Sequence, residues 1–222
     1  FRRGKMRSIL VLNAKGGSGK TTIATNLAGY YANQGKKVVL ADFDPQGSSI
    51  DWLRQRRRNF PKIMGIEAYS APIRVPKIAD ILIMDAPSRT HDEQLVSLLK
   101  RTETAIIPVV PSPMDIRAAQ RFFGELKSLR PSIQNDVRIA TIASRARENS
   151  RDTRNLEDLL YDFRLPSGRR FPFLTLIRQS ANYIRAAQKG ISIFEFAPLT
   201  TAIDREYWRP LIRWLGSRSS RP

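Results

Sequence analysis

The sequence predicts an α/β protein built on a mostly parallel, twisted sheet with helices covering both faces. Short apolar runs alternate along the chain with segments of helical periodicity, which is the pattern of right-handed βαβ units. A glycine-rich turn at residues 15–22 also follows the apolar run 9–12 and precedes a helical segment. Strand, glycine-rich turn and helix in this order are the context of a phosphate-binding loop. The predicted class is therefore a P-loop NTPase.

The expected strands are short apolar runs bounded by charged or turn-forming residues, as in buried parallel sheets. The run at 37–42 has charge on both sides, and the run at 63–69 alternates only weakly. In order along the chain, after 9–12, the strands are expected at residues 37–42, 63–69, 78–85, 104–110, 137–143 and 173–177.

The expected helices fill the intervals between these strands. Leu27 and Tyr30 lie on the apolar side of the first helix, and Gly35 follows its end as a C-cap. An arginine run ends the second helix, and Pro131 closes the fourth. His91, the single histidine, is interpreted as the start of a helix rather than as a catalyst. The helices are expected at residues 20–33, 50–58, 95–100, 115–129, 180–188 and 203–215, with one more between the last two strands.

The glycine-rich turn has the chemistry of a site for nucleotide phosphates. Glycines let successive backbone N–H groups converge on an anion, and the following helix N-terminus adds partial positive charge. Lys20 is expected to reach the β- and γ-phosphates of ATP, and the Thr21 hydroxyl to ligate Mg²⁺. A glycine-rich turn without a ligand is the alternative, and the flanking strand and helix disfavour it. The expected nucleotide-binding residues of the turn are Gly16, Gly17, Ser18, Gly19, Lys20, Thr21 and Thr22.

Two of the expected strands end in carboxylates. Asp42 and Asp44 come at the end of the strand at 37–42, and Asp85 ends the strand at 78–85. Ligands of open α/β sheets collect at the carboxyl ends of strands, so these acids are expected to face the glycine-rich turn. There they can hold Mg²⁺ through water and orient an attacking water. A lone acid at a strand end commonly caps the next helix, but three acids beside one phosphate loop favour the metal interpretation.

Composition limits the number of domains and the class of protein. A chain of 222 residues with 41% hydrophobic residues can bury one sizeable core, and no internal repeat or Gly/Ser linker divides it. We therefore expect a single domain over residues 1–222, with 1–5 a tag remnant or a short basic arm before Met6. No apolar run is long enough to span a membrane. The absence of cysteine excludes disulfides and thiolate metal sites and fits a cytoplasmic protein.

The net charge is strongly positive. Lys and Arg number 38 against 20 Asp and Glu, which gives +18. Such an excess favours a polyanionic partner, either nucleic acid or an anionic membrane, over a basic surface kept for solubility. Arginines are dense between Arg138 and Lys189, where their neighbours are more often polar than acidic. The candidate DNA-binding residues from this segment are Arg145, Arg147, Arg151, Arg154, Arg178 and Arg185, with Arg164, Arg169 and Arg170 nearby. The run Arg54, Arg56, Arg57 and Arg58 is a rival patch.

The turn K-G-G-S-G-K-T-T resembles the deviant Walker A motif of the ParA/MinD family of dimeric ATPases. In that family the first lysine crosses the dimer interface to the nucleotide of the partner subunit. The resemblance therefore implies that Lys15 acts in trans, while Lys20 serves the nucleotide of its own subunit. Both lysines are expected to be catalytic.

The acids at the strand ends also resemble motifs of this family. The stretch D-F-D-P-Q-G at 42–47 looks like its second motif, and D-A-P at 85–87 looks like its Walker B motif. The resemblance implies that Asp44 polarises the hydrolytic water and that Asp42 and Asp85 lie in the outer shell of Mg²⁺.

Two later segments extend the resemblance. Residues 107–115 look like the family's P-x-x-P-S-P-x-D stretch near the nucleotide base and the dimer surface, which adds Pro111 to the expected nucleotide-binding residues. Ile177-Arg178, followed by Tyr183 and Gly190, resembles a pattern of short plasmid-partition and organelle-positioning relatives. Ser144-Arg145 stands where relatives often carry an adenine-contacting Asn, so the sequence supports phosphate binding better than base specificity.

The resemblance implies a ParA-type ATPase of the short form, without an N-terminal helix-turn-helix extension. The family's iron–sulfur branch does not fit, because it needs cysteine ligands. In the implied cycle, ATP closes two subunits into a sandwich dimer, and the dimer binds DNA without sequence preference. Slow hydrolysis, stimulated by an adaptor protein, then releases it. This cycle positions a cargo, which is a plasmid, a chromosome region or a protein organelle such as a carboxysome. The expected location is cytoplasmic and nucleoid-associated.

Two alternatives remain open. A MinD-like ATPase would act on a membrane surface, and the basic, aromatic stretch 207–215 resembles the interfacial helix of such proteins. Pro210 interrupts this stretch, and Trp208 and Leu211 have the spacing of residues that pack on a core, so membrane binding is disfavoured. The other alternative is a metabolic P-loop enzyme such as a small-molecule kinase or synthetase, for which no further motif is found.

Overall fold

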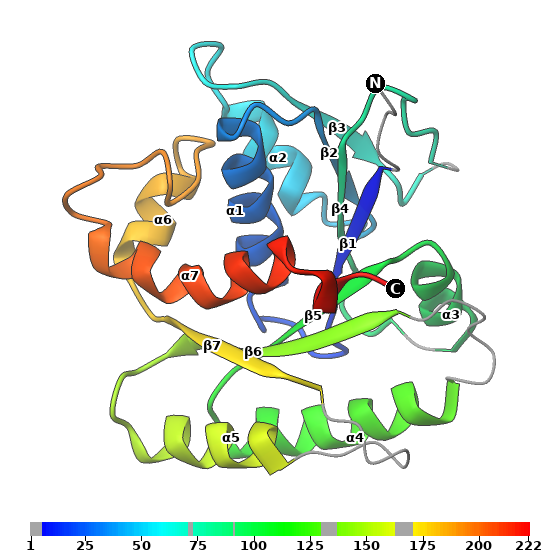
Figure 1. Cartoon of the computed structure of the whole chain (residues 1–222), viewed down its shortest axis with the longest axis vertical. Coiled ribbons are helices and arrows are strands. Elements are labelled where there is room, and N and C mark those ends of the chain that lie inside the picture. Colours follow the sequence, from blue (N-terminus) through cyan, green and yellow to red (C-terminus); the bar gives the residue numbers. More distant parts are fainter. Residues whose placement is uncertain (1–5, 71–72, 91, 130–136, 163–170) are drawn as a thin grey trace.

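Seven parallel strands form one sheet through the middle of the molecule (Figure 1). The structure is a computed structural model, and it describes residues 6–70, 73–90, 92–129, 137–162 and 171–222. The strand order is β3-β2-β4-β1-β5-β6-β7. The strands are β1 (Arg7–Val11), β2 (Val38–Asp42), β3 (Ile63–Glu67), β4 (Ile81–Asp85), β5 (Thr104–Val109), β6 (Arg138–Ala146) and β7 (Phe173–Arg178).

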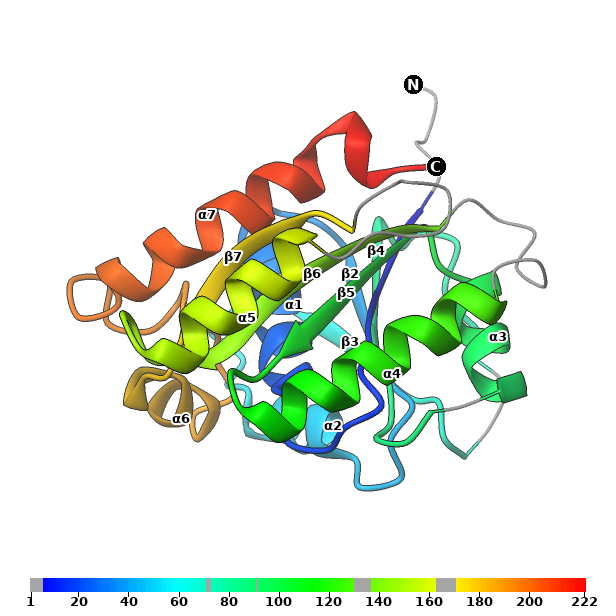
Figure 2. The same ribbon diagram turned by 90° about the horizontal axis from the view of Figure 1, so that it is seen from below.

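Helices cover both faces of this sheet, as the sequence predicts (Figure 2). Side chains alternate across a strand, so Leu10 of β1 belongs to one hydrophobic core while Ile9 and Val11 belong to the other. Helices α3, α4 and α5 complete the first core, and α1, α2, α6 and α7 complete the second. The helices are α1 (Lys20–Asn33), α2 (Ser48–Gln55), α3 (Asp92–Lys100), α4 (Pro113–Leu129), α5 (Arg151–Asp162), α6 (Ala181–Ala187) and α7 (Ala202–Gly216).

Helix α7 packs on the sheet through the residues that the sequence places on its apolar side. Trp208, Leu211 and Leu215 are fully buried, and the Trp208 indole donates a hydrogen bond to the Tyr183 hydroxyl at 2.9 Å. Pro210 lies inside the helix, on its exposed side, and does not end it. The apolar face of this stretch is therefore occupied by the core. Within the described residues, no helix has both the length and the apolar character that crossing a membrane requires.

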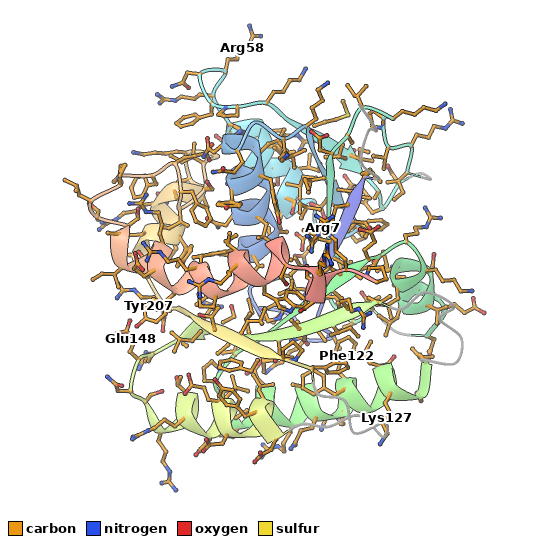
Figure 3. The ribbon with its side chains drawn as sticks, in the orientation of Figure 1. Arg7, Arg58, Phe122, Lys127, Glu148 and Tyr207 are labelled. Atoms are coloured by element: carbon orange, nitrogen blue, oxygen red, sulfur yellow. The ribbon has the colours of Figure 1, made fainter. Side chains whose placement is uncertain are left out.

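A buried guanidinium joins the first strand to the last turn of the chain. Arg7 donates to the Thr104 hydroxyl at 3.2 Å, to the Ser220 hydroxyl at 2.6 Å and to the Leu215 carbonyl. In Figure 3, Arg7 lies inside the molecule beside the end of α7, whereas Arg58 and Lys127 extend away from the body. Burial lowers the pKa of Arg7 from its ordinary value. The two ends of the described chain thus share one polar cluster within the fold.

Most observed boundaries differ from those expected by one to three residues, and two of them affect the candidate sites. Helix α2 ends at Gln55 rather than at 58, because Arg56 takes an extended backbone conformation as its side chain turns inward. Strand β6 continues to Ala146 rather than ending at 143. The predictions for His91, Pro131, Arg164, Arg169 and Arg170 fall outside the described residues.

Candidate nucleotide-binding site

The glycine-rich turn lies at the carboxyl end of the central strand. From β1 the chain first builds β2, β3 and β4 on one side and then β5, β6 and β7 on the other. The carboxyl end of β1 is therefore the topological switch point of the sheet, where ligands of open α/β folds bind. The turn connects this end to the first residue of α1, Lys20.

The conformation of the turn depends on two glycines with positive φ. Gly17 has φ +77° and Gly19 has φ +89°, a region that side chains with a Cβ rarely adopt. A Cβ at Gly19 would also lie 2.4 Å from the Ser144 hydroxyl oxygen. Gly19 is the N-cap residue of α1, and it has no side chain with which to cap the helix. The first N–H groups of α1 are thus left to bind an anion.

The two lysines of the turn lie in different surroundings. The Lys20 ammonium is buried and lies 3.4 Å from both the Lys15 carbonyl and the Ser88 hydroxyl. Burial lowers the pKa of Lys20, although Asp85 and Asp44 pull it upward. The Lys15 side chain is 37% exposed, and its ammonium pairs with the carboxylate of Asp115, at the start of α4, at 2.9 Å. The Lys20 ammonium therefore lies inside the turn, whereas the Lys15 side chain lies at its exposed edge.

Asp42 caps a helix. Its carboxylate is fully buried and accepts hydrogen bonds from the backbone N–H groups of Ser49 at 2.8 Å and Ile50 at 3.3 Å, in the first turn of α2. Its other oxygen accepts from the Asp44 N–H at 3.0 Å. Burial raises the pKa of Asp42, and these three backbone hydrogen bonds oppose the rise. For this acid, the helix-capping alternative describes the observed contacts.

Asp85 has one satisfied and one unsatisfied oxygen. The Ser49 hydroxyl donates to Oδ2 at 2.5 Å, whereas the buried Oδ1 has no hydrogen-bond partner among the described residues. Burial raises the pKa of Asp85 to about 7, and interactions with the Ser49 and Thr21 hydroxyls and with the Lys20 charge oppose this rise. A cation beside Oδ1 would favour the charged form.

Asp44 faces the turn across a cavity of about 560 Å³. Its carboxylate accepts from the backbone N–H groups of Gln46 at 3.0 Å and Ser88 at 3.3 Å. Lys20 and Thr21 line this cavity together with Asp44. The remaining lining residues are Gly17, Gly19, Thr22, Gln46, Ser48, Ser88, Ser144, Arg145, Ile177, Arg178, Gln179, Ser180, Ala181, Tyr183 and Ile184.

The oxygen atoms around this cavity fit Mg²⁺. Thr21 lines the cavity, and the unpartnered Oδ1 of Asp85 lies buried beside it, within electrostatic reach of Lys20. No three His, Cys, Asp or Glu side chains in the described ranges are grouped so that they could hold a metal ion. Mg²⁺ usually takes only one or two protein ligands and completes its shell with phosphate oxygens and water. The site thus suits a metal that arrives with a nucleotide.

Three further predicted nucleotide-binding residues do not line this cavity. Gly16 is exposed, and Ser18 is fully buried with a hydroxyl that has no partner among the described residues. Pro111 is half-buried between β5 and α4. Sequence reasoning did not assign Ser88 or Ser144 to the site. Ser88 follows β4 and Ser144 lies near the end of β6, and no spacing signal marks either of them as a contact of the turn.

The candidate DNA-binding arginines fall into three environments. Arg145 and Arg178 line the nucleotide cavity, and Arg178 is paired with the buried Asp204 at 2.7 Å and with Glu148 at 3.4 Å. Arg147 is exposed and donates to the Gln179 side chain at 3.4 Å. The other exposed candidates, which lie on helices α5 and α6, are Arg151, Arg154 and Arg185.

The rival arginine run is not a continuous surface patch. Arg56 is only 5% exposed and pairs with the buried Glu195 at 2.5 Å. Arg54 pairs with Asp51 at 2.7 Å and with Glu67 at 3.0 Å. Arg57 and Arg58 remain exposed.

The CobQ/CobB/MinD/ParA nucleotide-binding domain family matches residues 9–193, and the chain belongs to this family. Carboxysome distribution protein A of Halothiobacillus neapolitanus is 27% identical over 199 residues, which cover 86% of this chain and 88% of that protein. The chromosome-partitioning ATPase Soj of Thermus thermophilus is 54% identical over 54 residues, which cover 24% of this chain and 22% of that protein. The resemblance to the ParA/MinD family is thus confirmed.

Solved structures confirm the predicted fold class. The ATP complex of Cyanothece McdA matches with a TM-score of 0.73 and 17% identity over 93% of this chain and 96% of that one. MinD of Aquifex aeolicus matches with a TM-score of 0.69 and 18% identity over 95% and 97% of the two chains. Cobyrinic acid a,c-diamide synthase of Mycobacterium smegmatis, with bound ADP and magnesium, matches with a TM-score of 0.67 and 16% identity over 98% of each chain.

Proposed function

We propose that the protein is a ParA-type ATPase that positions a cargo through ATP-dependent dimerisation and DNA binding. The observation that carries the proposal is the cavity at the switch point. It brings a buried lysine, a threonine at a helix N-terminus and an opposing carboxylate to one place. These are the groups that bind a nucleoside triphosphate and hydrolyse it with water in enzymes of this chemistry.

Hydrolysis is assigned to residues around this cavity. When bound, Mg²⁺ would neutralise charge on the phosphates, with the Thr21 hydroxyl and Asp85 as the protein oxygens that hold it. Lys20 supplies a fixed positive charge in a buried position, where electrostatic stabilisation is stronger than in water. Asp44 accepts a hydrogen bond from the attacking water and orients it. Asp42 acts indirectly, because it fixes the backbone from Asp44 to α2.

Dimerisation is assigned to the rim of the same cavity. Lys15 lies in the glycine-rich turn beside the cavity and is partly exposed, so it can reach a second subunit once its ion pair with Asp115 opens. Ion pairs with one partly exposed partner contribute little stability, so opening this pair costs little. Two subunits facing each other across their nucleotides would exchange Lys15 and close both sites to water.

DNA binding is supported by charge. The chain carries +18, and the exposed Arg151, Arg154 and Arg185 have no carboxylate partner among the described residues. The ends of β6 and β7 lead into α5 and α6, so these arginines lie on helices that start at the cavity edge of the sheet. A dimer doubles the number of phosphate contacts, and affinity rises steeply with that number through counterion release.

The cargo and adaptor are proposed from the relatives. The long match to carboxysome distribution protein A favours a protein organelle, and the shorter match to Soj favours a chromosome region. An adaptor that stimulates hydrolysis completes the cycle, in the cytoplasm and on the nucleoid. The membrane alternative loses its main support, because the apolar residues of α7 are buried in the core.

The first test concerns Asp44. Asp44→Ala should keep ATP binding and lose hydrolysis by about 100-fold or more, the range for losing a positioned acid–base group. The variant should accumulate as a DNA-bound dimer. Asp51→Ala, which removes an exposed acid on α2, is the matched control and should hydrolyse normally. Turnover by Asp44→Ala at the parental rate would remove Asp44 from the mechanism.

The second test separates the two lysines. Lys20→Ala should weaken nucleotide binding by the monomer, since Lys20 lies inside the turn. Lys15→Ala should bind nucleotide normally but fail to dimerise with a slowly hydrolysed ATP analogue in sedimentation. Equal dimerisation of Lys15→Ala and the parent would exclude the role in trans.

A further inference from the structure

Arg145 reaches the phosphate loop from the opposite wall of the cavity. Its guanidinium donates to the Gly17 carbonyl at 3.3 Å, and its side chain lines the same cavity as Lys20 and Thr21. The residue before it makes a second contact, because the Ser144 hydroxyl occupies the space that a Cβ on Gly19 would need. Two adjacent residues at the end of β6, Ser144 and Arg145, thus contact the phosphate loop.

The backbone at this point is arranged so that the side chain faces the loop. Arg145 has φ +53°, in the left-handed region that non-glycine residues rarely adopt. Between Ser144 and Ala146, β6 advances by two residues while β7 advances by one, from Ile177 to Arg178. Arg145 is therefore the extra residue of a β-bulge. Bulges beside active sites redirect a side chain, and strained residues of this kind cluster at ligand sites.

The charge of Arg145 is not neutralised by the protein. Arg178, on the adjacent strand, is paired with Asp204 and Glu148. Within the described ranges no carboxylate pairs with Arg145, and its one hydrogen bond goes to a neutral carbonyl. A guanidinium in this position gains most from an anion that enters the cavity, because its planar fork matches phosphate oxygens.

We propose that Arg145 binds the phosphate chain of the nucleotide held by its own subunit, and that it is a nucleotide ligand rather than a DNA contact. This inference rests on the proposed function, since it requires a nucleotide in this cavity. It adds a cation from β6 to the lysine of the loop, so the phosphates are held from both sides. It also accounts for a strained arginine at the position where sequence comparison would look for a base-contacting asparagine.

The test uses the full chain and Mg–ADP, which measures binding without requiring dimerisation. Arg145→Gly should weaken Mg–ADP binding by about 10- to 100-fold, the usual effect of losing a hydrogen bond between charged groups. Without nucleotide, the melting temperature of Arg145→Gly should equal or exceed that of the parent chain, since glycine accepts the positive φ at this position. Arg145→Lys should bind with intermediate affinity, because it keeps the charge and loses the fork. Arg101→Ala, an exposed arginine outside the cavity, is the matched control and should bind Mg–ADP as the parent does.

The outcomes separate this inference from the proposed function. If the parent chain binds no Mg–ADP, the proposed function fails. If the parent binds and Arg145→Gly binds equally well, the assignment of Arg145 fails alone. An altered preference for Mg–ADP over Mg–GDP would instead assign Arg145 to the base and overturn its phosphate role. A loss of DNA affinity at saturating nucleotide, with Mg–ADP affinity unchanged, would return Arg145 to the DNA surface.

Discussion

The arginines at 54–58 and those at 147–154 look alike in the sequence, but the first group contains a buried arginine, Arg56, and the second does not. Arg56 donates to Glu195, to the Gly190 carbonyl and to the Pro61 carbonyl, and its guanidinium lies over the rings of Trp52 and Phe60. Arg151 and Arg154 are exposed, with no carboxylate partner among the described residues. Arg56 therefore stabilises the protein, whereas Arg151 and Arg154 are available to bind a polyanion. A count of arginines therefore overestimates the basic surface where one of them is buried in an ion pair with an acid.

The largest effect is expected at the buried pair. Arg56→Ala leaves Glu195 charged and unpaired at 2% exposure, so it should lower the free energy of unfolding by about 3–5 kcal/mol. Urea denaturation followed by circular dichroism measures this loss. Arg58→Ala, two residues on and exposed, should change the free energy of unfolding by less than about 0.5 kcal/mol. Similar losses in the two variants would erase the contrast between buried and exposed arginines.

A smaller loss is expected where the backbone approaches Arg56. Gly190 has φ +63°, and a Cβ there would lie 2.3 Å from the Arg56 backbone nitrogen. Gly190→Ala should therefore cost about 1–3 kcal/mol of unfolding free energy, through strain at a positive φ and displacement of Arg56. Gly124→Ala in α4, where a Cβ meets nothing within 4 Å, should stabilise the protein instead. If Gly190→Ala were as stable as the parent, the close contact would not matter.

The exposed arginines should affect DNA affinity without affecting stability. Each phosphate contact contributes about 0.9 to the slope of log affinity against log salt. The double variant Arg151→Glu/Arg154→Glu removes up to four contacts from the ATP-bound dimer, so it should flatten that slope by up to about 3.6 on random duplex DNA. Arg57→Glu/Arg58→Glu is the matched pair and should leave the slope unchanged. A larger change in the salt slope for the second pair would instead assign DNA binding to residues 57–58.

The smallest effect is expected for Arg54. Its partners Asp51 and Glu67 are exposed, and ion pairs of this kind contribute about 0–1 kcal/mol. Thermal denaturation of Arg54→Ala should show at most a small drop in melting temperature, which high salt abolishes. A loss as large as that of Arg56→Ala would mean that Arg54 also supports the core.

The fold could be predicted from sequence because its signals are local. Apolar runs of strand length, a glycine-rich turn and helical periodicity each report on neighbouring residues, and they place all seven strands close to their observed positions. The positions of Lys20, Thr21 and Asp44 around one cavity follow from the topology of a parallel sheet. The packing of Trp208 on the core follows from helical spacing.

The remaining features depend on contacts between distant segments. Arg56 and Glu195 are 139 residues apart, and nothing around Arg56 marks it as buried. The direction of Arg145 results from a bulge between β6 and β7, which exists only once these strands pair. Asp42 carries the same strand-end signal as Asp85, yet backbone N–H groups of α2 use its oxygens. Sequence spacing identifies both acids. It does not distinguish the acid that caps a helix from the acid that is proposed to hold Mg²⁺.

The hydrogen bonds of Arg7 make the packing of strand β1 depend on residues that are synthesised 208 and 213 residues later. Arg7 belongs to the strand that leads into the phosphate loop, yet its hydrogen-bond partners include Leu215 and Ser220. A nascent chain without these residues would leave Arg7 with the Thr104 hydroxyl but without its partners on Leu215 and Ser220, and a buried guanidinium with too few hydrogen bonds is costly. Strand β1 and its loop should therefore reach their final packing only after residues 215–220 have been synthesised. Chains truncated before Leu215 should bind nucleotide more weakly than the parent chain.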